Sequence, residues 1–316
     1  MPFTLIAGRF HVVGYSPDGD SIRFEPRDPE LLGRLGGFRP RMNARGHLQL
    51  RIEAIDTLET HYSPPSGGGV YAQPRRWADA ASDRLLGFAG VTGVRWDGAR
   101  RTVLAAMDGT PGYILSRSVE KNGRPIAFVF AGDPPEDDGA SIVLQPDRLR
   151  DSFNHLALRE GLAYPTFYTG LFGTLRDALA EAVIEARAAG RGLWPEDRGT
   201  AGFDPTELAV ITEEAPILPK LFRRLCDYMV ATGGAVGFKR KLERGREPVL
   251  DLRTNNFTHF DSFVEQAEGG TAIRLTRNAE ELVFDEMPQR TAAYFSVMLA
   301  SDEPVFRPSP AVRPDL

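Results

Sequence analysis

Short apolar segments of strand length, separated by turns, fill the first 131 residues of the chain. Residues 4–15 form the first segment, and it stops at 16–20, a Ser-Pro-Asp-Gly-Asp turn signal before a second strand at 21–24. Apolar and polar residues then alternate through 48–54, and this period of two indicates a strand with one buried face. Further strands are predicted at 102–107, 112–118 and 124–131. The pattern predicts a fold that is mainly β with packed helices.

Helices are predicted between and after these strands. Four apolar residues in 77–88 recur at spacings of four, four and three, so they share one helix face. A second helix is predicted at 152–160, closed by Gly161, and a third ends at Gly190, since glycine often closes a helix. Long connections are predicted at 26–46, 62–70 and 132–150.

The 316 residues fit two domains, given about 100–200 residues per domain. Composition turns to Pro, Gly, Glu and Thr after residue 195, which predicts a first domain at 1–197 and a linker at 198–218. A smaller accessory α+β domain of unknown function would follow at 219–303, and a Pro-rich tail at 304–316. Within the accessory domain we predict a helix at 219–231, a basic cluster at 239–246, and strands at 249–252, 271–275 and 281–284.

Charge and composition exclude several classes of protein. The 38 basic and 43 acidic residues give a net charge of −5, so any contact with nucleic acid must be local. The single cysteine, Cys226, excludes an intrachain disulfide and a cysteine-based metal site. The five histidines show no metal-ligand spacing such as H-x-x-x-H. Without a signal peptide or a run of 18 apolar residues, the expectation is a cytoplasmic protein with no membrane segment.

Five short motifs along the first 197 residues carry the chemistry. Each motif alone is more often a structural feature, such as a turn, a local side-chain cap or a helix end, than part of a functional site. In order, they are Asp18-Gly19-Asp20-Ser21, Arg51-x4-Asp56-Thr57-Leu58-Glu59, Gly123-Arg124-Pro125-Ile126-Ala127, Gly161-Leu162-Ala163 and Gly192-Leu193-Trp194.

Together the motifs resemble the staphylococcal nuclease-like (thermonuclease) family over about residues 3–197. That family's pattern is D-G-D-T, then R-x4-D-T-P-E, then G-R-x-L-A, then helices that end in G-L-A and G-L-W. Five ordered motifs with matching gaps are hard to obtain by chance. The resemblance implies a five-stranded OB-fold barrel with packed helices.

The resemblance also implies a metal site. Asp20 and Asp56 would supply carboxylates to Ca²⁺, and the carbonyl of Thr57 would add a third oxygen, because hard cations prefer oxygen ligands. Asp18 would not bind the metal itself but would orient these ligands from the second coordination shell. Mg²⁺ or another divalent cation is the alternative metal.

Three further residues would act on the substrate, by the same resemblance. Glu59 would position or deprotonate the attacking water. Arg51 and Arg124 would clamp the phosphate oxygens, since a planar, permanently charged fork matches them. Ordinary alternatives are a solvated loop acid for Glu59 and a surface strand residue for Arg51.

Some positions depart from the family pattern or stay ambiguous. Ser21 replaces the usual Thr, and Asn122 stands where an aromatic residue is frequent. Leu58 replaces a Pro, which we expect to loosen the loop that carries the catalytic acid, because Pro fixes φ. Phe167 and Tyr168 would either stack on a nucleobase or belong to the core.

The sequence therefore predicts a metal-dependent nuclease that hydrolyses phosphodiester bonds of DNA and/or RNA by water attack. The alternative is a catalytically inactive OB-fold module that binds nucleic acid or a protein partner. The C-terminal domain would recognise a protein partner or restrain the nuclease. Its basic run at 239–246 is either a solvated helix face or an accessory nucleic-acid contact.

Overall fold

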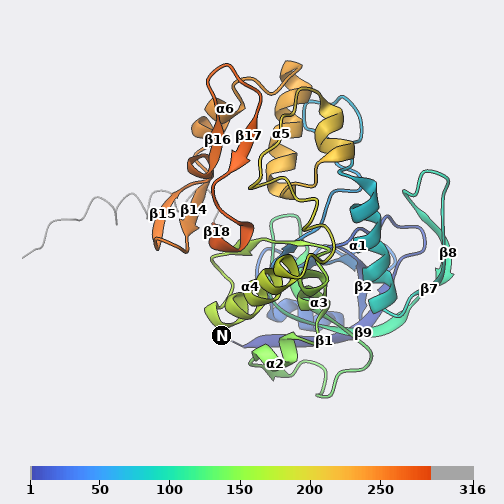
Figure 1. The fold of residues 1–316 in the computed structure, drawn as a ribbon. Helices are drawn as coiled ribbons and strands as arrows, with labels where there is room; N and C mark the ends of the chain where they lie inside the picture. Colours follow the sequence, from blue (N-terminus) through green and yellow to red (C-terminus); the bar gives the residue numbers. More distant parts are fainter. Residues whose placement is uncertain (1, 286–316) are drawn as a thin grey trace, which may run out of the picture.

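A nearly closed, barrel-like sheet forms the lower half of the molecule in the computed structural model, which describes residues 2–285 (Figure 1). Its strands run in the order β4-β2-β1-β9-β10-β5, with β11 beside β1 and β3 beside β9. Strands β4 and β5 are separated only by Leu50 yet stand at opposite ends of this order, so the chain draws the two edges together. The strands of this sheet are β1 (Phe3–His11), β2 (Arg23–Pro26), β3 (Gly36–Gly37), β4 (Leu48–Gln49), β5 (Arg51–Ile52), β9 (Thr110–Val119), β10 (Pro125–Ala131) and β11 (Ser141–Ile142).

Two glycines allow the central strands to curve around large aromatic side chains. Gly8 of β1 pairs with Gly112 of β9. A Cβ at Gly112 would lie 2.1 Å from the ring of Phe10, and a Cβ at Gly8 would lie 2.5 Å from the ring of Phe24. These two rings, with centroids 5.5 Å apart, fill the space that the missing side chains leave.

The strand predicted at 48–54 is wrong as one continuous element. It is divided into β4, β5 and a separate strand, β6 (Ile55–Asp56). Ala54 has a φ of 66°, a left-handed conformation that turns the chain out of the barrel. The turn lets β6 pair with β12 (Tyr164–Pro165), which places Asp56 opposite Tyr164.

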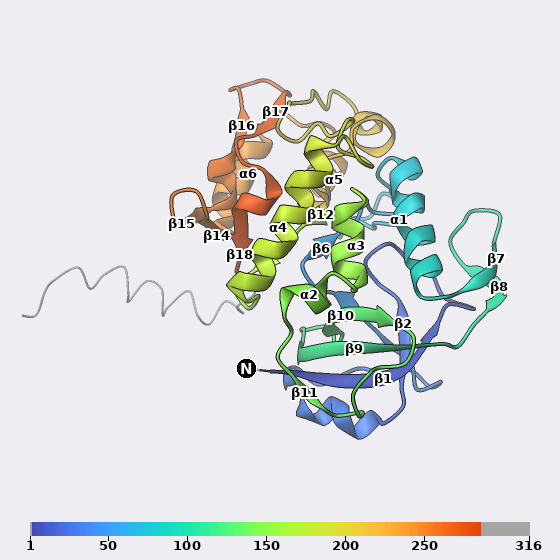
Figure 2. The same ribbon diagram turned by 60° about the horizontal axis from the view of Figure 1, so that its bottom comes forward.

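Helices α1 (Arg75–Phe88), α3 (Phe153–Arg159) and α4 (Gly173–Ala188) lie between the barrel and the C-terminal elements (Figure 2). They match the three helices predicted in this region. The connection predicted at 132–150 also holds β11 and α2 (Pro146–Leu149). The hairpin of β7 (Thr92–Trp96) and β8 (Val103–Met107) stands away from the barrel, and its first strand was not predicted.

Strands from both sides of residue 197 share one sheet, ordered β13-β18-β14-β15. Phe167 of β13 pairs with Val283 of β18 in a parallel register. Arg187 of α4 donates to Glu280 with Nη–Oε distances of 2.5 and 2.9 Å. The remaining elements are β13 (Phe167–Tyr168), α5 (Pro219–Thr232), α6 (Phe238–Gly245), β14 (Pro248–Asp251), β15 (Asn256–His259), β16 (Val264–Gln266), β17 (Ile273–Leu275) and β18 (Leu282–Phe284), with short helical turns at Pro29–Arg34, Val210–Glu214, Phe260–Phe263 and Ala279–Glu281.

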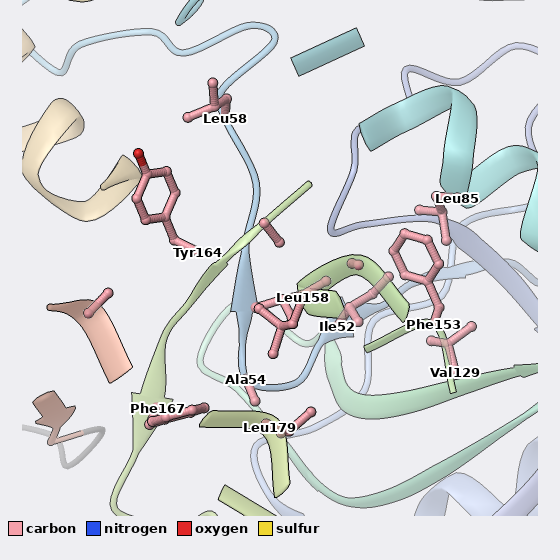
Figure 3. Packing of buried hydrophobic residues seen from close by; sticks show 14 of the residues in the cluster. Ile52, Ala54, Leu58, Leu85, Val129, Phe153, Leu158, Tyr164, Phe167 and Leu179 are labelled. Carbon is pink, nitrogen blue, oxygen red and sulfur yellow. The ribbon is translucent and has the colours of Figure 1, made fainter. Parts of the chain in front are cut away.

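The buried apolar residues form one cluster that extends from the barrel through the helices into the C-terminal elements. Phe153 of α3 lies between Leu85 of α1 and Val129 of β10 (Figure 3). Ile211, Ile217 and Leu218, inside the predicted linker, are also buried. The predicted tail at 304–316 lies outside the described residues. Within residues 2–285, no helix has the length and apolar character needed to cross a membrane.

Candidate active site

A tight turn between β1 and β2 carries the first two acids. Asp18 and Asp20 flank Gly19, whose absent side chain leaves room for α1 and Thr57: a Cβ there would lie 2.6 Å from the Cβ of Ala81 and 2.7 Å from Cγ2 of Thr57. The carbonyl of Asp20 accepts from Ile52 N–H at 3.0 Å, and its Oδ2 accepts from Thr57 N–H at 3.1 Å. The turn is thereby fixed against β5 and the segment that follows β6.

Strand β6 and the segment that follows it carry the other two acids. Asp56 belongs to β6. The backbone of Glu59 makes two hydrogen bonds with Gln73: Glu59 N–H donates to Gln73 Oε1 at 3.2 Å, and Gln73 N–H donates to the Glu59 carbonyl at 2.8 Å. Leu58 is 1% exposed and packs in the core (Figure 3). The side chain of Leu58 therefore anchors the loop at the position where a Pro was expected.

Mutual repulsion and burial shape the ionisation of this acid cluster, by which we mean Asp18, Asp20, Asp56 and Glu59. Burial raises the pKa of Asp20 well above its ordinary value, and the charges of the other three acids raise it further. Burial also raises the pKa of Glu59 to about 7, although a nearby arginine opposes this. Oδ1 of Asp18 is buried with no hydrogen-bond partner among the described residues. Burial and mutual repulsion therefore favour the protonated, neutral forms of Asp20 and Glu59.

The arginine that enters the cluster is Arg223, from α5. Its Nη1 lies 3.0 Å from Asp56 Oδ1 and 2.5 Å from Glu59 Oε1, and its Nη2 lies 2.6 Å from Asp56 Oδ2. Burial works against its charge, but the two carboxylates hold the pKa of Arg223 well above its ordinary value. Arg223 is therefore a permanent cation within the acid cluster.

Two contacts on either side of Arg223 hold α5 in place. Tyr62 donates to Asp227 Oδ1 at 2.7 Å, and Nε2 of Gln73 donates to the carbonyl of Ile217 at 2.8 Å. Arg223 was not predicted as a site residue, because 167 residues separate it from Asp56 and it belongs to none of the five motifs. One of two adjacent arginines on a predicted helix does not indicate a partner so far away in the sequence.

The carboxylate oxygens of the acid cluster are the ligands that a hard cation prefers. Their present arrangement, however, leaves no place for a cation that is bound by Asp56. Both oxygens of Asp56 are engaged by Arg223. Within residues 2–285, no three side chains of the acid cluster bring ligand atoms within 4.8 Å of one another. A cation that used Asp56 would first require Arg223 to leave.

Of the two predicted phosphate-binding arginines, one lies on β5 and the other lies directly before β10, the strand that pairs with β5. The guanidinium carbon of Arg51, on β5, lies 4.6 Å from the centre of the Tyr168 ring. Arg124 precedes β10, and its Nε donates to Glu120 Oε1 at 3.0 Å. Tyr168 is half-buried, whereas Phe167 is fully buried and belongs to the core, which was the alternative for that residue.

Two neighbouring cavities, one lined by Arg124 and the other by Ser21, make up what we call the basic groove. A cavity of about 610 Å³ is lined by Arg23, Arg41, Arg124 and Gln49, among others. A second cavity, of about 250 Å³, shares Arg23 and Gln49 with it and is also lined by Ser21. Nε2 of Gln49 donates to Ser21 Oγ at 2.9 Å, which links the groove to the residue after Asp20.

No protein-family model matches this chain, and no curated protein matches its sequence. The function of the acid cluster and the basic groove must therefore be inferred from their own chemistry. The acid cluster suits a cation or a proton, and Arg23, Arg41 and Arg124, which line the larger cavity, suit a polyanion.

Proposed function

We propose that this chain is a metal-dependent nuclease of the thermonuclease type, built on an OB-fold barrel, which hydrolyses phosphodiester bonds of DNA and/or RNA. The observation that carries the proposal is the acid cluster itself. The charges of Asp18, Asp56 and Glu59 all act on Asp20, and the guanidinium of Arg223 pairs with two of these four carboxylates, Asp56 and Glu59. A protein gains no stability from such repulsion, which is typical of sites that bind a cation or move a proton.

The residues of the site have separate roles in this proposal. Glu59 positions and deprotonates the attacking water, and a carboxyl with a pKa near 7 suits a general base at neutral pH. Arg124 binds phosphate oxygens from the groove after its guanidinium leaves Glu120. Arg51, which lies over the Tyr168 ring, binds phosphate oxygens, and Tyr168 stacks on a nucleobase.

A divalent cation, Ca²⁺ or Mg²⁺, would be held by Asp20 and Asp56 with the Thr57 carbonyl, and when bound it supplies positive charge to the scissile phosphate. Asp18, with its unpartnered oxygen, orients this donor set. Arg223 competes with this cation for Asp56, and it also pairs with Glu59, the proposed base. The C-terminal segment thereby restrains the nuclease.

One observation favours the second candidate, a catalytically inactive module. The ion pair of Arg223 with Asp56 is bidentate and leaves neither oxygen of Asp56 without a partner. If that pair never opens, Arg223 replaces the metal permanently and the groove only binds nucleic acid.

Cleavage of fluorescently labelled single-stranded DNA and RNA distinguishes the two candidates. We expect the full chain to cleave at least one of them in Ca²⁺ or Mg²⁺, to stop in excess chelator, and to lose activity by about 100-fold or more in Glu59→Gln. Asp147→Asn, an exposed acid of α2, is the matched control. Tight binding of the labelled strands with no cleavage in either metal would overturn the nuclease and favour the inactive module.

A further inference from the structure

Two histidines and a glutamate meet on one face of the barrel, although their sequence spacing gives no metal signal. His11 is on β1, opposite Arg23 of β2, and Glu25 is two residues further along β2, on the same face. Phe24 pairs with Leu48, so the antiparallel register, continued by one step, places His47 opposite Glu25. Three adjacent segments of the sheet thus bring His11, Glu25 and His47 together.

The potential ligand atoms of these side chains are close. His11 Nε2 lies 2.9 Å from Glu25 Oε2, and the rings of His11 and His47 are stacked with centroids 4.0 Å apart. One ligand atom from each residue lies within 4.8 Å of the other two, and no other such group of three occurs within residues 2–285. Ligand atoms around tetrahedral Zn²⁺ are about 3.3 Å apart, so side-chain movements of about an ångström would close the site.

The other ring nitrogen of each histidine has a partner that would orient it. Nδ1 of His11 lies 3.5 Å from Asp108 Oδ2, and Asp108 is fixed because Oδ1 accepts from Val12 N–H at 2.7 Å. Nδ1 of His47 lies 3.0 Å from the hydroxyl of Tyr15, which also accepts from Asn43 at 2.8 Å. A carboxylate or hydroxyl behind Nδ1, with Nε2 turned to the ligand side, is the usual arrangement of metal-binding histidines.

We propose that His11, His47 and Glu25 form a binding site for one first-row divalent transition metal ion, with Asp108 and Tyr15 as positioning residues. Two imidazoles and a carboxylate select Zn²⁺ and its neighbours over Ca²⁺ or Mg²⁺. The Glu25 side chain is 45% exposed, which leaves the fourth coordination position open to water or to a small ligand. The site uses no residue of the acid cluster, so it stands whether or not the chain is a nuclease.

Titration of the full chain, first freed of metal by a chelator, with Zn²⁺ by calorimetry and with Co²⁺ by visible absorption tests the proposal. We expect saturation near one ion per chain and tetrahedral Co²⁺ bands. His47→Gln should weaken binding by about 100-fold, and Asp108→Asn by about 10-fold. Glu25→Gln is a second ligand variant, in case His47→Gln alters the fold; His259→Gln and Glu59→Gln are controls that should bind like the parent.

Absence of saturable binding would overturn the site. Binding of equal strength in the His47→Gln and Glu25→Gln variants would also overturn it. Loss of binding in Glu59→Gln alone would place the ion in the acid cluster instead of on the barrel face.

Discussion

Two acids of the acid cluster, Asp56 and Glu59, share the guanidinium of Arg223. The Arg223 side chain is 29% exposed, and those of Asp56 and Glu59 are 9% and 19% exposed. Removal of the cation from such a group leaves two carboxylates with little water to solvate them.

Arg223→Gln should therefore destabilise the protein in chelator, by up to about 3–5 kcal/mol, and Ca²⁺ should restore part of the loss. Thermal and urea unfolding with and without Ca²⁺ measure this. Arg224→Gln is the matched control, because the next residue of the same helix pairs with Glu247 instead. An equal response of both variants to Ca²⁺ would contradict the idea that Arg223 occupies the place of a cation.

Glu59 gives a prediction about pH. Its pKa of about 7 in the folded protein lies above its ordinary value of 4.5, so between these values the folded state binds more protons than the unfolded state. The free energy of unfolding should fall as pH rises through this window, by on the order of 3 kcal/mol from this residue. Urea unfolding at pH 5 and pH 8 should show a smaller fall for Glu59→Gln than for the parent; identical slopes would count against a buried, proton-binding Glu59.

At the scale of elements, the turn at 16–20 and the left-handed residue Ala54 decide where the acids lie. The turn was predictable, since its Pro, Asp and Gly residues are typical turn formers. The break at Ala54 was not, because an alanine with a φ of 66° follows from tertiary contacts rather than from local preference. The resemblance to the staphylococcal nuclease-like family nevertheless implied that Asp18, Asp20, Asp56 and Glu59 share one site.

Gly19→Ala tests the close packing of that turn. The added Cβ would lie 2.6 Å from Ala81 of α1 and 2.7 Å from Thr57, so we expect a loss of about 1–3 kcal/mol in the free energy of unfolding and a displaced Asp20. Gly33→Ala is the control, since nothing lies within 4 Å of its added Cβ. If urea unfolding finds both variants equally stable, the turn is not packed as described.

Across the whole molecule, the two segments on either side of residue 197 are joined by a shared sheet, by the pair of Arg187 with Glu280, and by Arg223. Local patterns predicted α5 and β18 themselves, but not their partners, because periodicity carries no information about contacts over such distances. For the same reason the sequence did not predict the barrel-face cluster of His11, Glu25 and His47, because the pairing register of the strands brings these residues together. A point variant at Arg223 is therefore a cleaner probe of restraint than a truncation at 197, which would expose Phe167 and the rest of the shared sheet.

The most direct measurement is the Ca²⁺ dependence of single-turnover cleavage of a labelled single strand by the parent, Arg223→Gln and Arg224→Gln. If Arg223 competes with the cation for Asp56, Arg223→Gln should reach half its maximal rate at a Ca²⁺ concentration about 5- to 150-fold lower than the parent, and Arg224→Gln should match the parent. Cleavage by none of the three proteins at any Ca²⁺ concentration, or the same Ca²⁺ dependence in all three, would contradict a nuclease restrained by Arg223.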